Sequence, residues 1–303
     1  MSKHANSVFL PLLHSMRLRT LPLSLSGVLL GLFFAIRDVA CGVGECIFLL
    51  LTAVSLQILS NLSNELGDFL SGTDGDDRNG PAYSLQSNQL SVRTMRIAIA
   101  VAAVVCACFG ATMVWFSFGT LFSAEAVALL CLGAAAIWAA VRYTLGRNPY
   151  GYRGFGDVFV FIFFGLVSVG GSYFVLAHEL PLLLLLPAAS VGFFSVGVLN
   201  VNNLRDMETD KETRVTIPLK IGERRAKVYH CFLIGFGWLC MIVYVFITQT
   251  SMWNWLFLLA LPLYVKHVAG VLALTGRALD KMLPLLVMST LLFCILAGAG
   301  GLC

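Results

Sequence analysis

The chain has 303 residues, of which 58% are hydrophobic and only 12% are charged, and its mean hydropathy is +0.86. Soluble domains typically carry about 25% charged residues, so this composition excludes an ordinary soluble protein. The net charge of +4 is small, and nothing in the sequence indicates a nucleic-acid partner. Nine cysteines without C-x-x-C spacing indicate neither a zinc site nor a disulfide framework.

Apolar runs of about 20 residues are long enough to cross a bilayer as helices. The sequence predicts nine of them, at about 20–37, 46–67, 95–118, 124–142, 156–177, 181–202, 228–249, 252–275 and 283–303. Residues 1–19 precede the first run and are expected to form an interfacial segment. The expected fold is an all-α, polytopic membrane protein, organised as a single domain over residues 1–303.

The basic residues are distributed unevenly between the connecting segments. If nine helices cross the membrane, every Lys and Arg except Arg37 belongs to the side of the N-terminus. Cytoplasmic loops are enriched in Lys and Arg, so we expect an inner-membrane protein with a cytoplasmic N-terminus and an external C-terminus. The long polar loops, at 68–94, 143–156 and 203–227, then face the cytoplasm. Function is expected there.

Two acidic segments share one spacing. In "NLSNELGD", Asn61, Asn64 and Asp68 stand at offsets 0, 3 and 7, and "NNLRDMETD" repeats these offsets. Its matching residues are Asn203, Asp206 and Asp210. These offsets place three side chains on one helical face, so the two segments are expected to face each other across a cavity near the cytoplasmic side. Two solvated helix ends are the alternative.

Oxygen ligands on facing helices suit Mg²⁺, which takes one or two carboxylates and completes its shell with water and substrate phosphates. Several cations could bind such phosphates, and Arg does so with a planar fork. The candidates are Arg78, Arg147, Arg153, Lys211 and Arg214. The residues alone therefore predict a magnesium and diphosphate site.

"NELGDFLSGTDGDDRNGP" and "NNLRDMETDKETRVTIP" resemble the two aspartate-rich motifs of the UbiA superfamily of intramembrane aromatic prenyltransferases. The resemblance covers most of the chain, including "RLRTLPLS" before the first predicted helix. The middle loop, "YTLGRNPYGYRGFGD", is most similar to the branch that acts on 1,4-dihydroxy-2-naphthoate in menaquinone biosynthesis.

The resemblance implies that Mg²⁺ bridges the diphosphate of a polyprenyl donor to both motifs. Ionisation would leave an allylic cation, which 1,4-dihydroxy-2-naphthoate attacks with loss of carbon dioxide, giving a demethylmenaquinol. The expected metal ligands are Asn64, Asp68, Asp74, Asp206 and Asp210. Gly72 occupies the usual place of a third acid in the first motif, which leaves Asp74 as the candidate and Asp77 as the alternative.

The expected catalytic residues are Asp68, Asp206 and Arg147, the last standing where the superfamily often has lysine. Substrate binding is assigned to Asn64, Arg78, Tyr143, Tyr150, Arg153, Asn203, Lys211 and Arg214. The tyrosines could equally belong to an interfacial belt. Aromatic rings could shelter the cation or only pack, the candidates being Phe161, Phe163, Phe164, Phe193 and Phe194.

Two other functions stay open. One is prenyl transfer to a different acceptor such as 4-hydroxybenzoate. The other is a cation-coupled transporter, in which ionisable groups would lie near the middle of the membrane. In this sequence the acids lie at the ends of predicted helices, which favours the enzyme.

Overall fold

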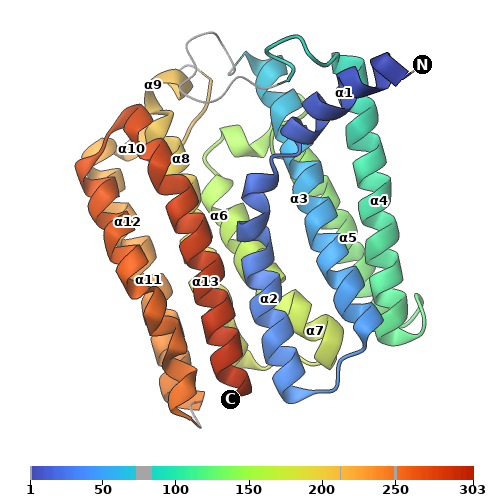
Figure 1. The fold of residues 1–303 in the computed structure, drawn as a ribbon, viewed down its shortest axis with the longest axis vertical. Helices are drawn as coiled ribbons and strands as arrows, with labels where there is room; N and C mark the ends of the chain where they lie inside the picture. Colours follow the sequence, from blue (N-terminus) through green and yellow to red (C-terminus); the bar gives the residue numbers. More distant parts are fainter. Residues whose placement is uncertain (1, 73–83, 212, 249–250) are drawn as a thin grey trace.

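The computed structural model describes residues 2–72, 84–211, 213–248 and 251–303, and of residues 2–7 only the backbone. These parts of the chain form a bundle of long, roughly antiparallel helices (Figure 1). No strand occurs in the described ranges, which hold one isolated bridge between Arg153 and Val215. The predicted all-α class is confirmed.

Nine stretches of the described residues are long and apolar enough to cross a membrane, as predicted. The first, Val8–Asp38, takes in the second half of α1 (Ser2–Ser15) together with η1 (Leu18–Thr20) and α2 (Leu21–Asp38). The next three are α3 (Val43–Ser71), α4 (Val92–Phe118) and α5 (Ala124–Arg142). The fifth comprises α6 (Gly156–Val160), η3 (Phe161–Gly171) and α7 (Ser172–Ala177), and the sixth η4 (Leu182–Leu184) and α8 (Leu185–Arg205). The last three are α11 (Glu223–Thr248), η5 (Met252–Ala260) with α12 (Leu261–Ala273), and η6 (Gly276–Lys281) with α13 (Met282–Leu302).

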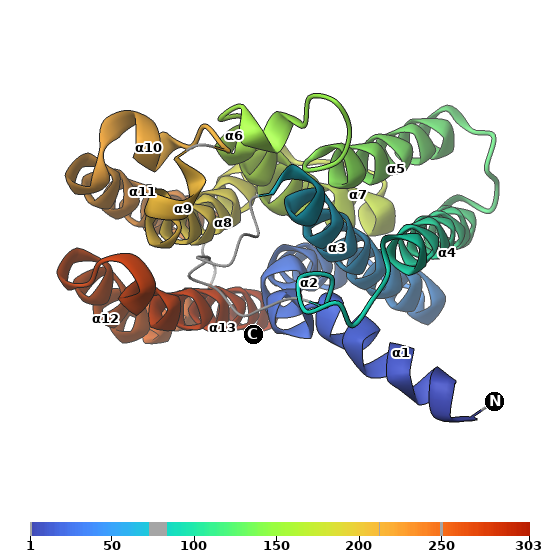
Figure 2. The ribbon, with the colours of Figure 1, turned by 90° about the horizontal axis from the view of Figure 1, so that it is seen from above.

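Three short helices lie in the polar connections: η2 (Tyr150–Tyr152), α9 (Met207–Asp210) and α10 (Ile217–Ile221). Helices α1, α9 and α10 lie at one end of the bundle, and the C-terminus lies at the other (Figure 1). Seen from above, α1 projects outward from the bundle (Figure 2). The chain turns between α1 and η1 at Arg17, which has a φ of 48°.

Local sequence explains several helix ends. Ser91 and Ser123 precede α4 and α5, and their hydroxyls accept hydrogen bonds from the backbone N–H of Thr94 and Ala126. Such caps satisfy N–H groups that have no partner within the helix. Helix α3 ends at Ser71 and is followed by Gly72, whose φ of 74° is readily adopted by glycine.

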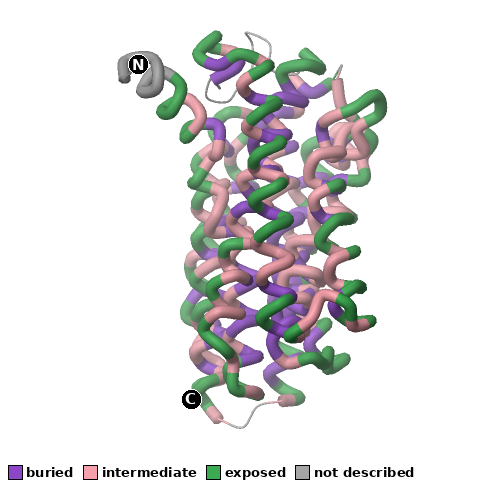
Figure 3. The backbone as a smooth tube through the Cα atoms, turned by 90° about the vertical axis from the view of Figure 1, so that its right-hand side faces the viewer, coloured by how far each residue is buried: buried purple, intermediate pink, exposed green. Residues whose placement is uncertain are grey.

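Exposed residues follow the outside of the bundle and buried residues its inside (Figure 3). Large apolar side chains such as Val104, Phe236 and Leu272 are exposed on the helices, as expected for surfaces that face lipid. Inside, η3 and α8 approach closely, because a Cβ on Gly165 would lie only 2.6 Å from the Cα of Gly192. Small residues permit such approach between membrane helices.

The C-terminal half contains a buried aromatic core. The ring of Phe194 lies 4.7 Å from that of Tyr264 and 5.1 Å from that of Phe293. The sequence did not reveal that two histidines pair nearby, with the Nε2 atoms of His230 and His267 2.9 Å apart. One ring therefore donates to the other within the bundle.

Candidate active site

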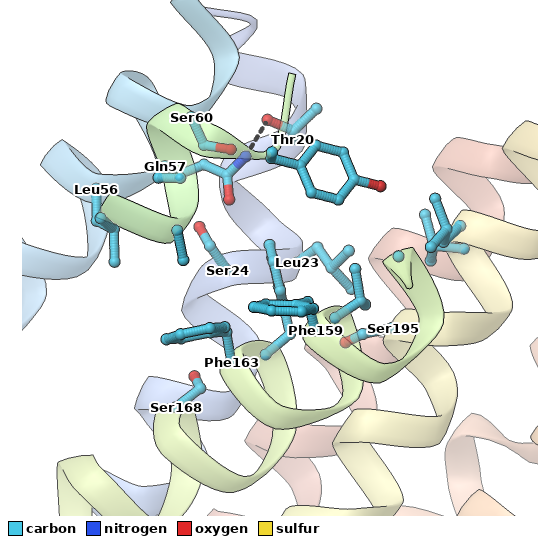
Figure 4. Close-up of a pocket in the computed structure, with 18 of the residues that line it drawn as sticks. Thr20, Leu23, Ser24, Leu56, Gln57, Ser60, Phe159, Phe163, Ser168 and Ser195 are labelled. Atoms are coloured by element: carbon cyan, nitrogen blue, oxygen red, sulfur yellow. Dashed lines mark hydrogen bonds between the residues drawn. The ribbon is translucent and has the colours of Figure 1, made fainter. Parts of the chain in front are cut away.

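A cavity of about 600 Å³ lies within the bundle. Figure 4 shows the rings of Phe159 and Phe163 on one side and the polar side chains of Gln57 and Thr20 on another. The amide Nε2 of Gln57 donates to the hydroxyl of Thr20 at 3.3 Å. Asn61 is buried next to this pair and donates to Thr20 at 2.9 Å. The polar lining includes Arg17, Arg19, Asn64, Asp68, Asp157, Asn202, Asn203, Arg205, Arg214 and Asp280.

The first acidic motif lies on the cavity wall. Because α3 continues to Ser71, Asn64 and Asp68 are one turn apart on the same face, and both line the cavity. Asp68 is 3% exposed and accepts two hydrogen bonds, from the hydroxyl of Tyr152 at 2.7 Å and from Nη2 of Arg214 at 2.8 Å. The Oδ1 atom of Asn64 lies 3.2 Å from the hydroxyl of Thr144.

Arg214 joins the two motifs. Its Nε lies 3.4 Å from Oδ1 of Asp210, while Nη2 contacts Asp68, and its guanidinium lies 4.9 Å from the ring centre of Tyr152. Burial acts to lower the pKa of Arg214, but the charges of Asp68 and Asp210 outweigh it, so the pKa is raised. The fully charged guanidinium thus brings together acids that are far apart in the sequence.

The second acidic motif has a different environment. Helix α8 ends at Arg205, and Asp206 has a φ of −96° and a ψ of 10° before α9 begins. The predicted continuous helix face is therefore interrupted at Asp206. Its two carboxylate oxygens accept from Nε and Nη2 of Arg205, at 2.7 and 2.6 Å. Asp206 and Asp210 are buried and do not line the cavity, whereas Asn203 does.

Tyr143 and Tyr150 both line the cavity. The hydroxyl of Tyr150 donates to the backbone oxygen of Ala139 at 2.7 Å, and its ring stacks on Phe159 with centres 3.9 Å apart. Burial raises the pKa of Tyr143 to about 12, so this hydroxyl is protonated near neutral pH. Both tyrosines are therefore positioned as parts of the cavity wall.

Several predicted phosphate-binding residues lie elsewhere. Arg147, Arg153 and Lys211 are exposed and are not among the cavity-lining residues. Lys211 pairs instead with Glu208 at 2.6 Å. Asp74, Asp77 and Arg78 lie outside the described residues.

The structure adds residues to which the sequence gave no such role. Arg17, Arg19 and Arg205 line the cavity together with Arg214. Arg17 and Arg19 belong to "RLRTLPLS", and Arg205 directly precedes Asp206. Their positions within or beside the recognised motifs could have marked them as candidate site residues. Asp157 also lines the cavity, where it accepts a hydrogen bond from the hydroxyl of Tyr229 at 2.8 Å.

Of the five phenylalanines considered for the cation, Phe163 and Phe164 line the cavity. Phe161 and Phe193 pack on each other with ring centres 4.9 Å apart, and Phe194 belongs to the aromatic core. Three of the five phenylalanines therefore pack against other rings and do not line the cavity.

The donor set allows a test of whether Mg²⁺ fits. Among the described residues, no three His, Cys, Asp or Glu side chains gather closely enough to hold a metal by themselves. Mg²⁺ needs fewer, because it takes one or two protein carboxylates and the rest of its ligands from water and phosphate. Asn64 and Asp68 offer neighbouring side-chain oxygens on the cavity wall. They therefore fit a magnesium ion that arrives with a diphosphate.

The fold and the site define a multi-pass helical membrane protein whose internal cavity carries acids and arginines. A model of the UbiA prenyltransferase family matches residues 24–281. The chain therefore belongs to this family.

Relatives and solved structures agree with this assignment. The chain is 39% identical to the 1,4-dihydroxy-2-naphthoate octaprenyltransferase of Escherichia coli over 86% of its own length and 84% of the relative's. Its identity to the enzyme of that name from Haemophilus influenzae is 35%, over 84% and 83% of the two chains. A UbiA homolog from Archaeoglobus fulgidus bound to GPP and Mg²⁺ has a similar fold, with a TM-score of 0.68 and 13% identity over 96% and 99% of the chains. For the apo structure of a UbiA homolog from Aeropyrum pernix, the TM-score is 0.67 at 15% identity over 95% and 96%.

Proposed function

We propose that this protein transfers a polyprenyl group from polyprenyl diphosphate to 1,4-dihydroxy-2-naphthoate. The C–O bond of the donor breaks first and releases diphosphate, and the acceptor carbon then bonds to the allylic cation and loses carbon dioxide, giving a demethylmenaquinol. The relatives of that name, at 31–39% identity over most of the chain, support the reaction. The structural observation that carries the proposal is the contact of Asp68 with Arg214 on the cavity wall.

The polar part of the cavity would bind the metal and diphosphate, and the apolar part would enclose the prenyl cation. Asn64 and Asp68 would hold Mg²⁺, which neutralises charge on the departing diphosphate. Arg214 adds a permanent positive charge at the same place, and Arg17, Arg19 and Arg205 provide others. Phe159, Phe163 and Phe164 exclude water from the allylic cation and offer it their ring faces. Each such contact contributes on the order of 0.5–2 kcal/mol.

The orientation in the inner membrane is part of the proposal. The residues that line the polar part of the cavity include those at the ends of α3 and α8 that share one end of the bundle with α1 (Figure 1). The Lys and Arg distribution favours the cytoplasm for this end. Under this arrangement, the chain acts as one membrane domain that receives both substrates from the cytoplasmic side. Labelling of single cysteines by an impermeant reagent tests it, and rapid labelling of position 208 from outside would contradict it.

The assay that tests the reaction uses purified protein in detergent with octaprenyl diphosphate and Mg²⁺. With 1,4-dihydroxy-2-naphthoate, we expect a prenylated naphthoquinol and an equal amount of carbon dioxide. With 4-hydroxybenzoate, we expect no product, and a carboxylated product there would instead support the other acceptor. Asp68→Asn should lose activity, while Glu45→Gln at the opposite end of α3 serves as the matched control. Ion flux in vesicles without any prenylated product would favour the transporter.

A further inference from the structure

Asp280 belongs to neither acidic motif but lines the same cavity. It lies in η6, which connects α12 to α13, and its side chain is 46% exposed. Its Oδ1 accepts a hydrogen bond of 2.7 Å from Nη1 of Arg205. A carboxylate from a distant part of the sequence thus contacts the arginine that precedes the second motif.

The guanidinium of Arg205 is shared between two acids. Its Nε and Nη2 face Asp206, Nη2 also donates to Oδ1 of Asn202 at 2.8 Å, and Nη1 is directed at Asp280. The side chains of Arg205 and Asp206 are only 5% and 7% exposed, so solvent screens this pair weakly, whereas Asp280 is partly solvated. Two carboxylates and one guanidinium leave this group with one net negative charge beside the cavity.

We propose that Asp280 is a positioning residue for the second acidic motif. By holding the far side of Arg205, it prevents this guanidinium from neutralising Asp206 completely. The remaining negative charge favours the magnesium that accompanies a prenyl diphosphate into the cavity. This inference rests on the proposed function and assigns to it a residue outside the two motifs.

The charge balance predicts what removal of the Asp280 charge does. In Asp280→Asn, Arg205 and Asp206 form a neutral pair, so the local field becomes less favourable for a divalent cation. Charges a few ångströms apart in a partly buried site interact strongly enough to change a binding constant by about tenfold. Asp280→Glu keeps the negative charge and should therefore keep the affinity for Mg²⁺.

The test measures binding without turnover. The melting temperature of the protein in detergent is followed as MgCl₂ is increased at a fixed concentration of geranyl diphosphate, with no aromatic acceptor. We expect Asp280→Asn to raise the half-saturating Mg²⁺ concentration about tenfold, and Asp280→Glu to stay within about twofold of the wild type. Glu208→Gln is the matched control, because Glu208 is also a carboxylate paired with a cation, but on the exposed face of α9.

A second measurement separates positioning from folding. In steady-state assays, Asp280→Asn should raise the Mg²⁺ concentration needed for half-maximal rate, while kcat at saturating Mg²⁺ stays within about threefold. An unchanged Mg²⁺ dependence in Asp280→Asn would overturn the inference, as would a Glu variant as impaired as the Asn variant. Absence of Mg²⁺-dependent stabilisation in the wild type would overturn the proposed function itself.

Discussion

The two acidic motifs have the same spacing in the sequence but different surroundings in the structure. In the first, α3 runs unbroken past Asp68, so Asn64 and Asp68 both reach the cavity. In the second, α8 ends at Arg205, and Asp206, which does not line the cavity, forms a two-bond pair with that cavity-lining arginine. Equal offsets therefore give one face only where the helix continues through them.

The difference predicts unequal roles for the two motifs. Asp68 presents its carboxylate beside the cavity with Tyr152 and Arg214 as partners. The acids of the second motif pair with arginines: Asp206 pairs with Arg205, and Asp210 pairs with Arg214. Under the proposed function, the first motif would supply ligand oxygens, whereas the second would set the net charge around Arg205 and Arg214. Substitutions on each side test this contrast.

Asp68→Asn should give the largest loss. The change keeps the size of the side chain but removes a charge that is expected to contact Mg²⁺ and that pairs with Arg214, whose side chain is 15% exposed. We expect kcat/KM to fall 10²-fold or more, a barrier increase of about 2.7 kcal/mol. Initial rates measure it, with folding checked by thermal melting and Glu45→Gln as control. A folded variant with near wild-type rates would refute the role of the first motif.

Asp206→Asn should be less damaging, with a loss of about 10-fold to 10²-fold, because it acts through Arg205. A double-mutant cycle with Asp68→Asn shows whether the motifs cooperate. If they form one clamp, the double variant is far less impaired than the product of the single defects. Effects that multiply cleanly would mean that the two motifs act independently.

Arg214 is the residue that joins the two motifs, so its shape should matter in addition to its charge. Arg214→Lys retains a cation but cannot contact Asp68 and Asp210 with a planar fork. We expect about a tenfold loss of kcat/KM for Lys, or about 1.4 kcal/mol, and a larger loss for Ala. Equal losses in the two variants, measured at saturating Mg²⁺, would show that charge plays no part.

Tyr152→Phe removes one hydrogen bond to Asp68 and leaves the ring beneath Arg214. Burial and the nearby Asp68 raise the pKa of Tyr152, so its hydroxyl is protonated and can donate. Loss of one such bond costs about 1 kcal/mol, which corresponds to a loss of about fivefold in rate. Tyr150→Phe is the control, because its hydroxyl bonds to the backbone of Ala139. Equal rate losses in both variants would contradict a specific role for Tyr152.

Arg147→Ala should have the smallest effect, although the family resemblance suggests a catalytic role for this residue. The side chain is exposed and does not line the cavity. We expect kcat/KM to stay within about threefold of the wild type, which is about 0.7 kcal/mol. A much larger loss, with Arg147→Lys active, would instead support a contact with phosphate.

The sequence was sufficient for the fold because apolar length is a strong local signal. The predicted helix at 124–142 coincides with α5, and the one at 95–118 lies within α4. The shared face of Asn64 and Asp68 also followed from the sequence, because α3 carries the motif without interruption. These successes depend on residues close together in the chain.

The pairing of charges could not be found in this way. Arg214 contacts Asp68 across 146 positions, and Arg205 contacts Asp280 across 75. Spacing carries no information about such contacts, and a charged residue in a polar loop can equally face solvent, as Lys211 does. Arg17 and Arg19 were counted only as markers of topology, although both line the cavity.

The close approach of Gly165 to Gly192 has a consequence for how the cavity can evolve. Neighbouring residues of η3 and α8, such as Ser168 and Ser195, line the cavity, yet the backbone contact between the two glycines leaves no side chain to shorten. Any larger residue there must push the two helices apart. On α5, by contrast, a Cβ added to the cavity-lining Gly133 would meet no atom within 4 Å. Substitutions on α5 can therefore change the size of the cavity to suit longer or shorter prenyl chains, whereas substitutions at the contact between η3 and α8 cannot.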